Sequence, residues 1–310
     1  MDTWKVIVSK KSGNGKAYTQ WPEVKAALVD AGLQFSESFT EYVGHASELA
    51  VEAIRGGFRK ILAVGGDGAI HEILNGVMSQ EEVPSSDITL AIVPVGSGND
   101  WARLYDIPKT SVEAVNLLLD GKSILQDVVR VDAVLDGKPS RRYMMNIGGL
   151  GIDAHVCWLF EQEKLKGKNG DLQYLKCLTK GFVKYKCPMF KVYTDDALFF
   201  EGYALSVALG NGKYCGGGMR QTPDADPSDG LIDLTVISKI PKVQFVTSIK
   251  HLYDGSIKEL KAASATRCRK VQIYSSPISF MEVDGELIGG SPVTAEVIPA
   301  AINVITNLQK

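Results

Sequence analysis

Apolar positions follow two patterns in the first 125 residues: short continuous runs, and longer stretches with apolar residues three or four positions apart. The runs are typical of buried strands and the stretches of amphipathic helices. Strands separated by helices of this length indicate βαβ units around a parallel sheet, whose ligands bind beyond the carboxyl ends of the strands. The predicted strands are 4–8, 33–39, 61–64 and 89–93, and the predicted helices are 21–31, 46–55, 70–78 and 111–119.

Near residue 127 the pattern changes to β-rich runs that follow one another closely. Turn signals at 136–140 and 195–196 join two pairs of runs into hairpins, and one helix is predicted at 241–253. We therefore expect an all-β, antiparallel, sandwich-like domain after the α/β domain. Its predicted strands are 128–134, 142–147, 191–194, 198–209, 231–238, 270–274, 278–283, 293–297 and 302–305.

Composition adds that the chain is an ordinary globular protein. Its 310 residues suit two domains, and 45% of them are hydrophobic. A net charge of −2 gives no general attraction for nucleic acid, and the four tryptophans are not interleaved with basic residues. The five cysteines are scattered without a CxxC pair, which favours a reducing cytoplasm. No apolar run approaches the ~20 residues needed to span a bilayer, and no signal peptide is expected before the first strand.

The candidate chemistry begins at Gly65-Gly66-Asp67-Gly68, between a predicted buried strand and a predicted helix. Glycines let backbone N–H groups approach phosphate oxygens, and a helix N-terminus adds a favourable field. Because the Asp67 carboxylate would repel a bare phosphate, it indicates a metal ion or a proton relay.

A second loop, 94–100, repeats this pattern after the neighbouring strand, with Gly96, Ser97, Gly98, Asn99 and Asp100. Taken alone, it is better explained as a turn that ends in a helix N-cap, where Ser, Asn and Asp are favoured. Two glycine and aspartate loops at one sheet edge are better explained as one site.

These motifs resemble those of the diacylglycerol kinase catalytic-domain family, which includes bacterial soluble lipid kinases and sphingosine kinases. The resemblance extends in order over nearly the whole chain. It comprises Gly65–Ala69 with Glu72 and Asn75-Gly76, Pro94–Asp100, Asn146–Asp153, Gly210–Gly212, Gly216–Gly218, Pro223–Gly230 and Asp284-Gly285-Glu286.

The resemblance implies an α/β nucleotide domain, Rossmann-like and of the kind found in NAD kinases and phosphofructokinases, and a C-terminal antiparallel β-sandwich domain. The first would span 1–127 and regain the last residues, about 299–310; the second would span 128–298. It implies an ATP- and Mg²⁺-dependent kinase that phosphorylates a lipid hydroxyl in a cleft between the domains.

Site residues follow from the same resemblance. Asp67 and Asp100 would hold the catalytic Mg²⁺, directly or through water, because this cation prefers oxygen ligands. Asp284 is the first candidate for the base that accepts the lipid hydroxyl proton, with Glu286 as the alternative. The nucleotide-binding candidates are Ser9, Lys10, Lys11, Ser12, Gly13, Thr40, Gly65, Gly66, Asp67, Gly68, Ala69, Ile70, His71, Glu72, Gly96, Ser97 and Asn99.

Two of these motifs also have plainer explanations. Asp284-Gly285 between β-runs is a common hairpin turn. The aspartates at 224, 226 and 229 suit a solvated loop, whereas the resemblance suggests a structural Mg²⁺ held by Asp226, Asp229 and Leu231.

The chain departs from the family pattern at three places. Ala69 stands where the family has threonine, His71 where it has asparagine, and Ser9-Lys10 where it has Asn-Pro. We expect His71 to cap a helix rather than bind phosphate. Ala69 and the altered first loop leave open a catalytically weak regulator that binds nucleotide or lipid. An NAD kinase-like phosphotransferase also stays open, because that related family shares the Gly-Gly-Asp-Gly turn.

The expected partner is a lipid, with no nucleic acid, and a homodimer stays open. Between 164 and 186, seven lysines accompany apolar residues at helical spacing. Such a helix could lie on anionic lipid at the inner face of the membrane, or cover the core of the β domain. We expect a cytoplasmic protein in either case.

Overall fold

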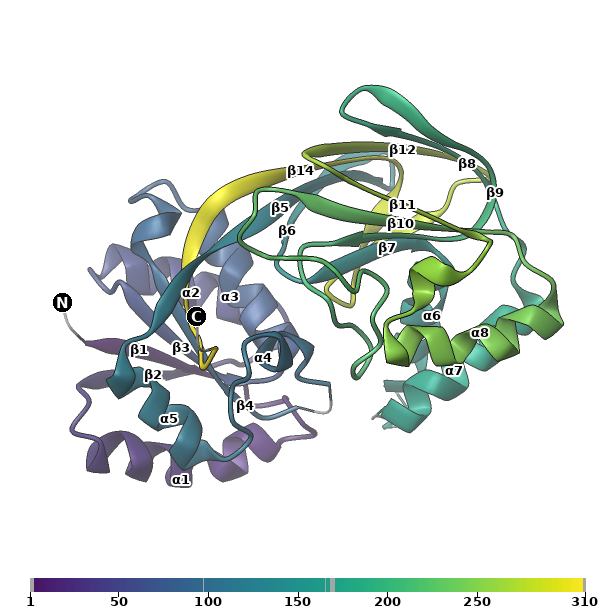
Figure 1. Ribbon diagram of the computed structural model, residues 1–310. Helices are drawn as coiled ribbons and strands as arrows, with labels where there is room; N and C mark the ends of the chain where they lie inside the picture. The colour runs from purple at the N-terminus through teal and green to yellow at the C-terminus, as the bar shows by residue number, and fades with distance from the viewer. Residues whose placement is uncertain (1–2, 97, 165, 168–170, 309–310) are drawn as a thin grey trace. The chain divides into compact units, whose positions relative to one another are not determined.

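The computed structural model describes residues 3–96, 98–164, 166–167 and 171–308 (Figure 1). The chain forms two compact units. Unit 1 consists of Met1–Asp127 with Pro299–Lys310, and unit 2 of Val128–Ile298. None of the helices in the described part of the chain is long and apolar enough to cross a membrane.

A parallel sheet forms the centre of unit 1, in the order β14–β4–β3–β1–β2. Strands β1, β3 and β4 are buried along almost their whole length, as expected for strands covered by helices on both faces. The strands are β1 (Trp4–Val8), β2 (Phe35–Phe39), β3 (Lys60–Gly65), β4 (Thr89–Pro94) and the last part of β14 (Glu286–Ile305).

The helices of unit 1 pack in two pairs, α1 with α5 and α2 with α3, on opposite faces of the sheet (Figure 1). The chain passes outward from β1 to β2 through α1 and then returns to β3 through α2, so strand order reverses between β1 and β3. This reversal is where α/β sheets open to ligands. The helices are α1 (Lys16–Asp30), α2 (His45–Arg55), α3 (Asp67–Ser79), α4 (Asp100–Leu104), α5 (Ser111–Asp120) and the short 3₁₀ helix η1 (Ser85–Asp87).

Unit 2 is an antiparallel β structure whose strand pairings close on themselves, from β9 through β7, β13, β14, β12 and β8 back to β9. Long β9 and β14 each pair with different neighbours along their two halves, which gives two layers around one apolar core. The strands are β5 (Ser123–Leu135), β6 (Lys138–Met144), β7 (Ile147–Gly151), β8 (Met189–Thr194), β9 (Ala197–Gly210), β10 (Ile232–Ser238), β11 (Ala263–Cys268), β12 (Lys270–Ser276) and β13 (Phe280–Val283).

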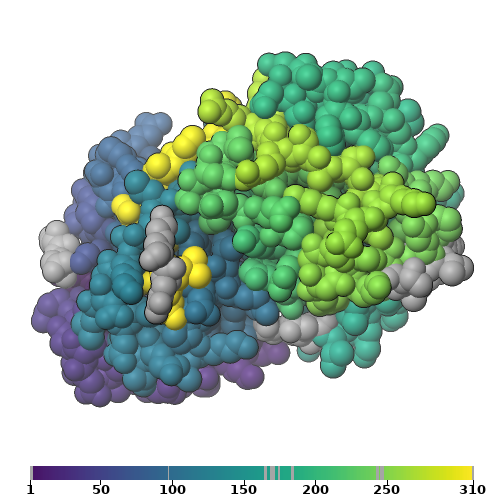
Figure 2. Space-filling view, in the orientation of Figure 1, coloured from purple at the N-terminus to yellow at the C-terminus, as the bar shows by residue number. Residues whose placement is uncertain are grey.

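Helices cover one side of this structure around a second apolar cluster that includes Val156, Leu178 and Ile237. They are α6 (Ile152–Lys164), α7 (Asp171–Lys184), α8 (Lys242–Asp254) and the 3₁₀ helix η2 (Ile257–Glu259). The green segments from the end of β9 to β11 cover much of the face of unit 2 seen in Figure 2.

The predicted fold class, α/β followed by antiparallel β, is confirmed, and the element boundaries differ at a few places. The predicted strand 142–147 is two strands, and the predicted strands 293–297 and 302–305 are parts of β14. The helix predicted within 164–186 is α7. Of its apolar residues, Leu178 and Phe182 are buried in the core and Leu175 packs against it, whereas Leu172 is 77% exposed. Part of α7 therefore covers the core, and contact with a membrane stays a prediction. Residues 165 and 168–170 of this segment lie outside the described residues.

Candidate functional site

The two glycine loops of unit 1 touch each other. Strands β3 and β4 pair in parallel up to Gly65 and Pro94, and the Val95 N–H donates to the Gly65 carbonyl at 2.7 Å. A Cβ on Gly96 would lie 3.0 Å from the Gly66 Cα, so the backbones approach more closely than side chains would allow. The predicted meeting of these loops at one sheet edge is therefore confirmed.

Asp67 joins the loops by a hydrogen bond. It is the first residue of α3, and its Oδ1 accepts from the Trp101 N–H of α4 at 3.0 Å. Asp100, the first residue of α4, is 5% exposed, and its Oδ1 lies 3.6 Å from Arg103 Nε. Both predicted metal carboxylates therefore stand at helix N-termini on adjacent loops.

Asn99 directly precedes Asp100, and its side-chain oxygen has no hydrogen-bond partner among the described residues. It is the N-cap of α4, as the plainer interpretation of this loop predicted, with a φ of 49°. Its Nδ2 donates to the Gly96 carbonyl at 3.0 Å. Its Oδ1 is buried and has no hydrogen-bond partner among the described residues. A buried acceptor without a donor is costly, which marks this position for a cation or another donor. The predicted nucleotide contact Ser97 lies outside the described residues.

The loop after β1 borders the same edge. The Ser9 N–H donates to the Val64 carbonyl at 3.0 Å, and the Ser12 hydroxyl donates to Ser9 Oγ at 2.8 Å. Gly13, with a φ of 60°, has the Val95 carbonyl oxygen 3.4 Å from where its Cβ would stand. The Lys10 N–H donates to Thr40 Oγ1 at 3.2 Å and brings in the loop after β2. Lys11 is exposed beside them.

The remaining candidates of α3 are largely buried. Ala69 and Ile70 are buried, and neither side chain carries a polar atom that could bind a phosphate. His71 is buried with its Nε2 3.3 Å from Asn75 Nδ2. The helix has no side-chain cap, so the expectation that His71 caps it is wrong. Glu72 accepts the Ala46 N–H at the start of α2 at 3.3 Å.

The donors at this edge fit a Mg²⁺ ion. Asp67, Asp100 and the buried Asn99 oxygen are the hard oxygen ligands that Mg²⁺ prefers, and this cation keeps several waters. Within the described ranges, no three His, Cys, Asp or Glu side chains form a complete ligand set. The protein would therefore supply part of the coordination, as is usual for a metal bound together with nucleotide phosphates.

In unit 2, Asp284 and Gly285 form the turn between β13 and β14. Both have positive φ, 48° and 87°, as a two-residue hairpin turn requires, so the predicted hairpin is confirmed. The Asp284 carboxylate accepts three backbone N–H groups, from Met145 at 2.8 Å, Asn146 at 3.0 Å and Ile147 at 3.1 Å. These bonds end β6 and begin β7, which is why the predicted strand 142–147 is broken there.

Asn146 and Asn211 hold the other side of this segment. The Asn146 carbonyl accepts the N–H groups of Asn211 and Gly212, each at 2.8 Å. Asn211 Nδ2 donates to the Met145 carbonyl, and Asn146 Nδ2 donates to the Tyr214 carbonyl. The asparagine and glycine motifs noted in the sequence therefore support the Asp284 turn.

Glu286 differs from Asp284 in its surroundings. Its side chain is 42% exposed, and its Oε1 lies 3.4 Å from Arg142 Nη2. One carboxylate of the pair is thus engaged by backbone, and the other faces an arginine at the surface.

Asp153, which follows the glycine segment before α6, was not among the site residues predicted from the sequence. Its carboxylate is buried and accepts hydrogen bonds from Ser206 Oγ and, at 2.6 Å, from Gln221 Nε2. Burial raises the pKa of Asp153, against the lowering effect of these two donors. It lies at the edge of a narrow cavity of about 50 Å³ with apolar walls from α6, α8 and β9. Asp153 is the last residue of the Asn146–Asp153 motif, so its place in that motif is the sequence signal that could have identified it.

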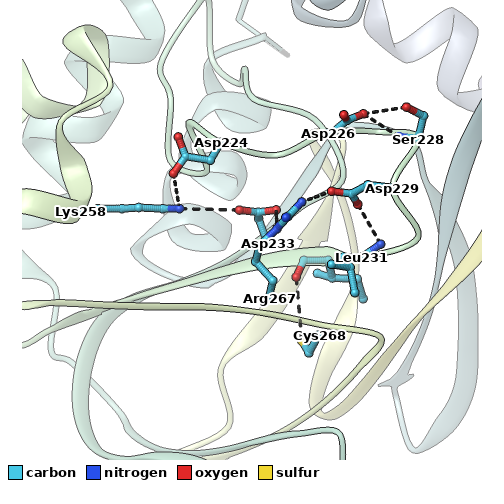
Figure 3. Close-up of polar contacts among 10 residues, drawn as sticks. Asp224, Asp226, Ser228, Asp229, Leu231, Asp233, Lys258, Arg267 and Cys268 are labelled. Carbon is cyan, nitrogen blue, oxygen red and sulfur yellow. Dashed lines mark hydrogen bonds and ion pairs between the residues drawn. The ribbon is translucent and has the colours of Figure 1, made fainter.

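The proposed structural metal site at Asp226, Asp229 and Leu231 is occupied by protein groups (Figure 3). Asp229 pairs with the Arg267 guanidinium through Oδ2 and accepts the Leu231 N–H through Oδ1 at 3.0 Å. Asp226 Oδ1 accepts both the N–H and the hydroxyl of Ser228. The donor set does not fit a cation here, because an arginine already supplies the positive charge.

The same network continues to a buried aspartate. Arg267 Nε lies 3.1 Å from Asp233 Oδ2, and Lys258 Nζ lies 2.6 Å from Asp224 Oδ2 and 3.7 Å from Asp233 Oδ1 (Figure 3). Asp233 is 2% exposed, and burial raises its pKa although Lys258 opposes the shift. The loop is therefore an ion-pair network and not merely a solvated turn.

Comparison with known proteins matches both units. The diacylglycerol kinase catalytic domain matches residues 3–131, and the YegS C-terminal NAD kinase beta sandwich-like domain matches residues 147–306. The chain is similar to "Probable lipid kinase YegS-like" of Xanthomonas euvesicatoria, with 27% identity over 97% of this chain and 95% of that protein. It is also similar to "Diacylglycerol kinase" of Staphylococcus saprophyticus, with 27% identity over 93% and 90%.

A solved structure agrees on the fold. A diacylglycerol kinase from Bacillus anthracis superimposes with a TM-score of 0.73 and 21% identity, over 99% of this chain and 97% of that one.

Proposed function

Since this chain belongs to the diacylglycerol kinase catalytic-domain family and is a lipid kinase that uses ATP, we propose that it transfers the γ-phosphate to the hydroxyl of a diacylglycerol-like lipid. The observation that carries the proposal is the contact between the two glycine loops of unit 1. It sets Asp67 and Asp100 at the carboxyl ends of β3 and β4, near the buried Asn99 oxygen that has no hydrogen-bond partner among the described residues.

The nucleotide phosphates are assigned to the backbone of Gly66 to Ala69. Gly68 has open space where a Cβ would stand, and its N–H belongs to the first turn of α3. Backbone N–H groups and the helix dipole both favour phosphate oxygens there. The loop after β1, with Ser9, Ser12 and the exposed Lys11, would complete the cradle and supply positive charge.

Mg²⁺ would be held by Asp67, Asp100 and the Asn99 oxygen, and when bound it would neutralise charge on the transferring phosphate. The protein groups provide the positions; Trp101 fixes Asp67, and Gly96 fixes Asn99.

Glu286 is the better candidate for the base. In the proposed step its carboxylate takes the proton of the lipid hydroxyl while the hydroxyl oxygen bonds to the γ-phosphorus and the bond to ADP breaks. Asp284 already accepts three backbone N–H groups, so it is assigned to holding the turn. Arg142 would orient Glu286.

The test compares Glu286→Gln with Asp284→Asn in a labelled-phosphate assay on diacylglycerol micelles. Glu286→Gln should lower kcat roughly 10²–10⁴-fold with little change in melting temperature, because it removes a base and weakens only an exposed ion pair with Arg142. Asp284→Asn should lower the melting temperature, because an amide cannot accept all three N–H groups; the cost is roughly 1–3 kcal/mol.

Glu296→Gln is the matched control, an exposed glutamate of β14 that pairs with Arg130. Near-normal turnover of Glu286→Gln would exclude it as the base. Transfer to NAD with none to lipid would overturn the proposed function, and nucleotide binding without any transfer would favour a regulator.

A further inference from the structure

A cavity of about 460 Å³ opens in unit 2 beside the Asp284–Glu286 turn. Its walls come from the beginning of α6, the segment after α7 and the loop before β13. They include His155, Trp158, Tyr185, Lys186, Ile278 and Phe280. The proposed mechanism uses none of these residues.

The rim of the cavity is strongly apolar and exposed. Trp158 is 47% exposed, Ile278 69% and Phe280 58%. His155 lies between Trp158 and Tyr185, with ring centroids 6.1 Å and 5.4 Å away, so the aromatic rings form one group. Exposed apolar groups of this size indicate a binding surface, and tryptophan is favoured where water meets lipid.

Among the described residues, the charged side chain that lines the cavity is a lysine. Lys186 lines the cavity and is exposed, and no acidic residue lines it in the described part of the chain. Next to it, the Ala204 N–H donates to the Pro188 carbonyl and the Lys239 N–H to the Tyr203 carbonyl. Lys239 Nζ lies 5.9 Å from the centre of the exposed Tyr203 ring. Apolar anchors flanked by lysines complement an anionic bilayer.

The surface is continuous with the catalytic turn. Leu287, the neighbour of Glu286, lines the cavity, and the Cys157 thiol of α6 donates to the Gly285 carbonyl at 3.1 Å. A lipid held at this cavity would therefore lie against the segment that carries the base.

We propose that Trp158, Ile278 and Phe280 form a docking surface that inserts into anionic bilayers, with Lys186 and Lys239 at the lipid headgroups. The inference rests on the proposed function, because a lipid substrate gives the protein a reason to bind a bilayer. Binding to the bilayer itself requires neither ATP nor phosphoryl transfer.

Tryptophan emission offers a direct probe of insertion. Trp4, Trp21 and Trp101 are buried at 3%, 6% and 1% exposure, so Trp158 is the tryptophan that a bilayer can reach. Vesicles of phosphatidylcholine and phosphatidylglycerol with brominated acyl chains should quench part of the emission of the wild-type protein. Trp158→Phe should still bind the vesicles and lose this quenching. Equal quenching in the two proteins, or none in either, would overturn the proposal.

Vesicle co-sedimentation without nucleotide tests the surface itself. The double variant Ile278→Ser with Phe280→Ser should bind these vesicles roughly a hundredfold more weakly, about tenfold for each side chain lost. Lys186→Glu should weaken binding only when phosphatidylglycerol is present. Leu198→Ser is the control, an equally exposed apolar residue near the β8–β9 turn, and should bind normally.

Melting temperatures near that of the wild type ensure that weakened binding reflects the surface. Unchanged binding of the double variant, or equal loss in Leu198→Ser, would overturn the proposal. The two proposals can also fail separately. If the wild-type protein binds vesicles but phosphorylates no lipid, and the double variant loses vesicle binding, the docking surface is supported and the proposed function is refuted.

Discussion

At the residue scale, the most informative group outside the proposed reaction is Asp153, a buried carboxyl whose pKa is raised by burial. The folded state therefore keeps a proton that the unfolded state releases above its ordinary pKa of about 3.9. The stability that this proton provides is complete below about pH 4 and is lost as pH rises through the raised pKa, because the native state then binds more protons than the unfolded state.

Asp153→Asn should remove this pH dependence. We expect a flatter profile of unfolding free energy above pH 4, where the wild type loses up to about 1.4 kcal/mol per pH unit through this group. Urea unfolding at several pH values measures the slope. Asp136→Asn, in the exposed β5–β6 turn, serves as the control and should keep the wild-type profile. A wild-type slope in Asp153→Asn would contradict the assignment.

Residue roles were predictable where they depend on neighbours in the sequence. The Asp284-Gly285 turn and the two glycine loops could be recognised from local pattern. That the Asp284 carboxylate binds the N–H groups of 145–147 could not, because its partners lie 137 to 139 residues away. The same holds for Arg267 at Asp229, where sequence pattern suggested a metal and the fold supplies a side chain.

At the element scale, substitutions at two glycines of α3 can test nucleotide binding and helix packing separately. A Cβ on Gly68 would meet nothing within 4 Å, whereas one on Gly76 would lie 2.4 Å from the Ser47 carbonyl oxygen of α2. Gly68→Ala should keep or raise the melting temperature, because alanine favours helix. It should also raise KM for ATP roughly tenfold by obstructing the N–H groups of the first turn.

Gly76→Ala is the matched comparison on the same helix. It should cost about 1–3 kcal/mol of stability, because α2 must move away to admit the methyl group. Its KM for ATP should change less than that of Gly68→Ala at a temperature where both are folded. Thermal melts and steady-state kinetics measure both effects, and an unchanged KM in Gly68→Ala would contradict the nucleotide assignment.

The β10–β11 hairpin carries a second element-scale prediction. Arg267 of β11 stands opposite Asp233 of β10 and also pairs with Asp229. Arg267→Gln should destabilise the protein by roughly 1–3 kcal/mol, because a buried carboxylate loses its cation while Lys258 remains. Without nucleotide, EDTA should leave the wild-type melting temperature unchanged. A fall with EDTA that Mg²⁺ reverses, and that persists in Asp67→Asn, would contradict the assignment of this charge to arginine.

Element boundaries were predictable for buried strands and less so at polar ends. Helix α1 begins at Lys16, five residues before the predicted start, because its first turns are largely polar and Pro22 lies inside it. Helix α6 was missed because its apolar residues follow a glycine strand without a break. Strand β14 was predicted as two strands because Pro299 and Ala300 interrupt the hydrophobic pattern. In the structure the strand continues through them, and the Asp127 carboxylate accepts the Ala300 N–H at 2.7 Å.

At the scale of the whole molecule, unit 1 depends on the end of the chain. The last part of β14 pairs with β4 at Asn303 and Val304, and Ile302, Val304 and Ile305 are buried. Ser85 Oγ and Asn303 Nδ2 add hydrogen bonds between this strand and the η1 region. A nucleotide unit built only from residues 1–127 therefore lacks an edge strand of its sheet.

Deletion of residues 299–310 should consequently unfold unit 1, because it removes three core side chains, each worth about 2–5 kcal/mol when truncated, and exposes β4. Circular dichroism and ATP titration measure the loss. A synthetic peptide of residues 297–308 added in trans should restore part of both signals, whereas a peptide with Ile302 and Val304 changed to serine should not. A truncated chain that melts like the wild type and binds ATP equally well would show that β14 is dispensable for unit 1.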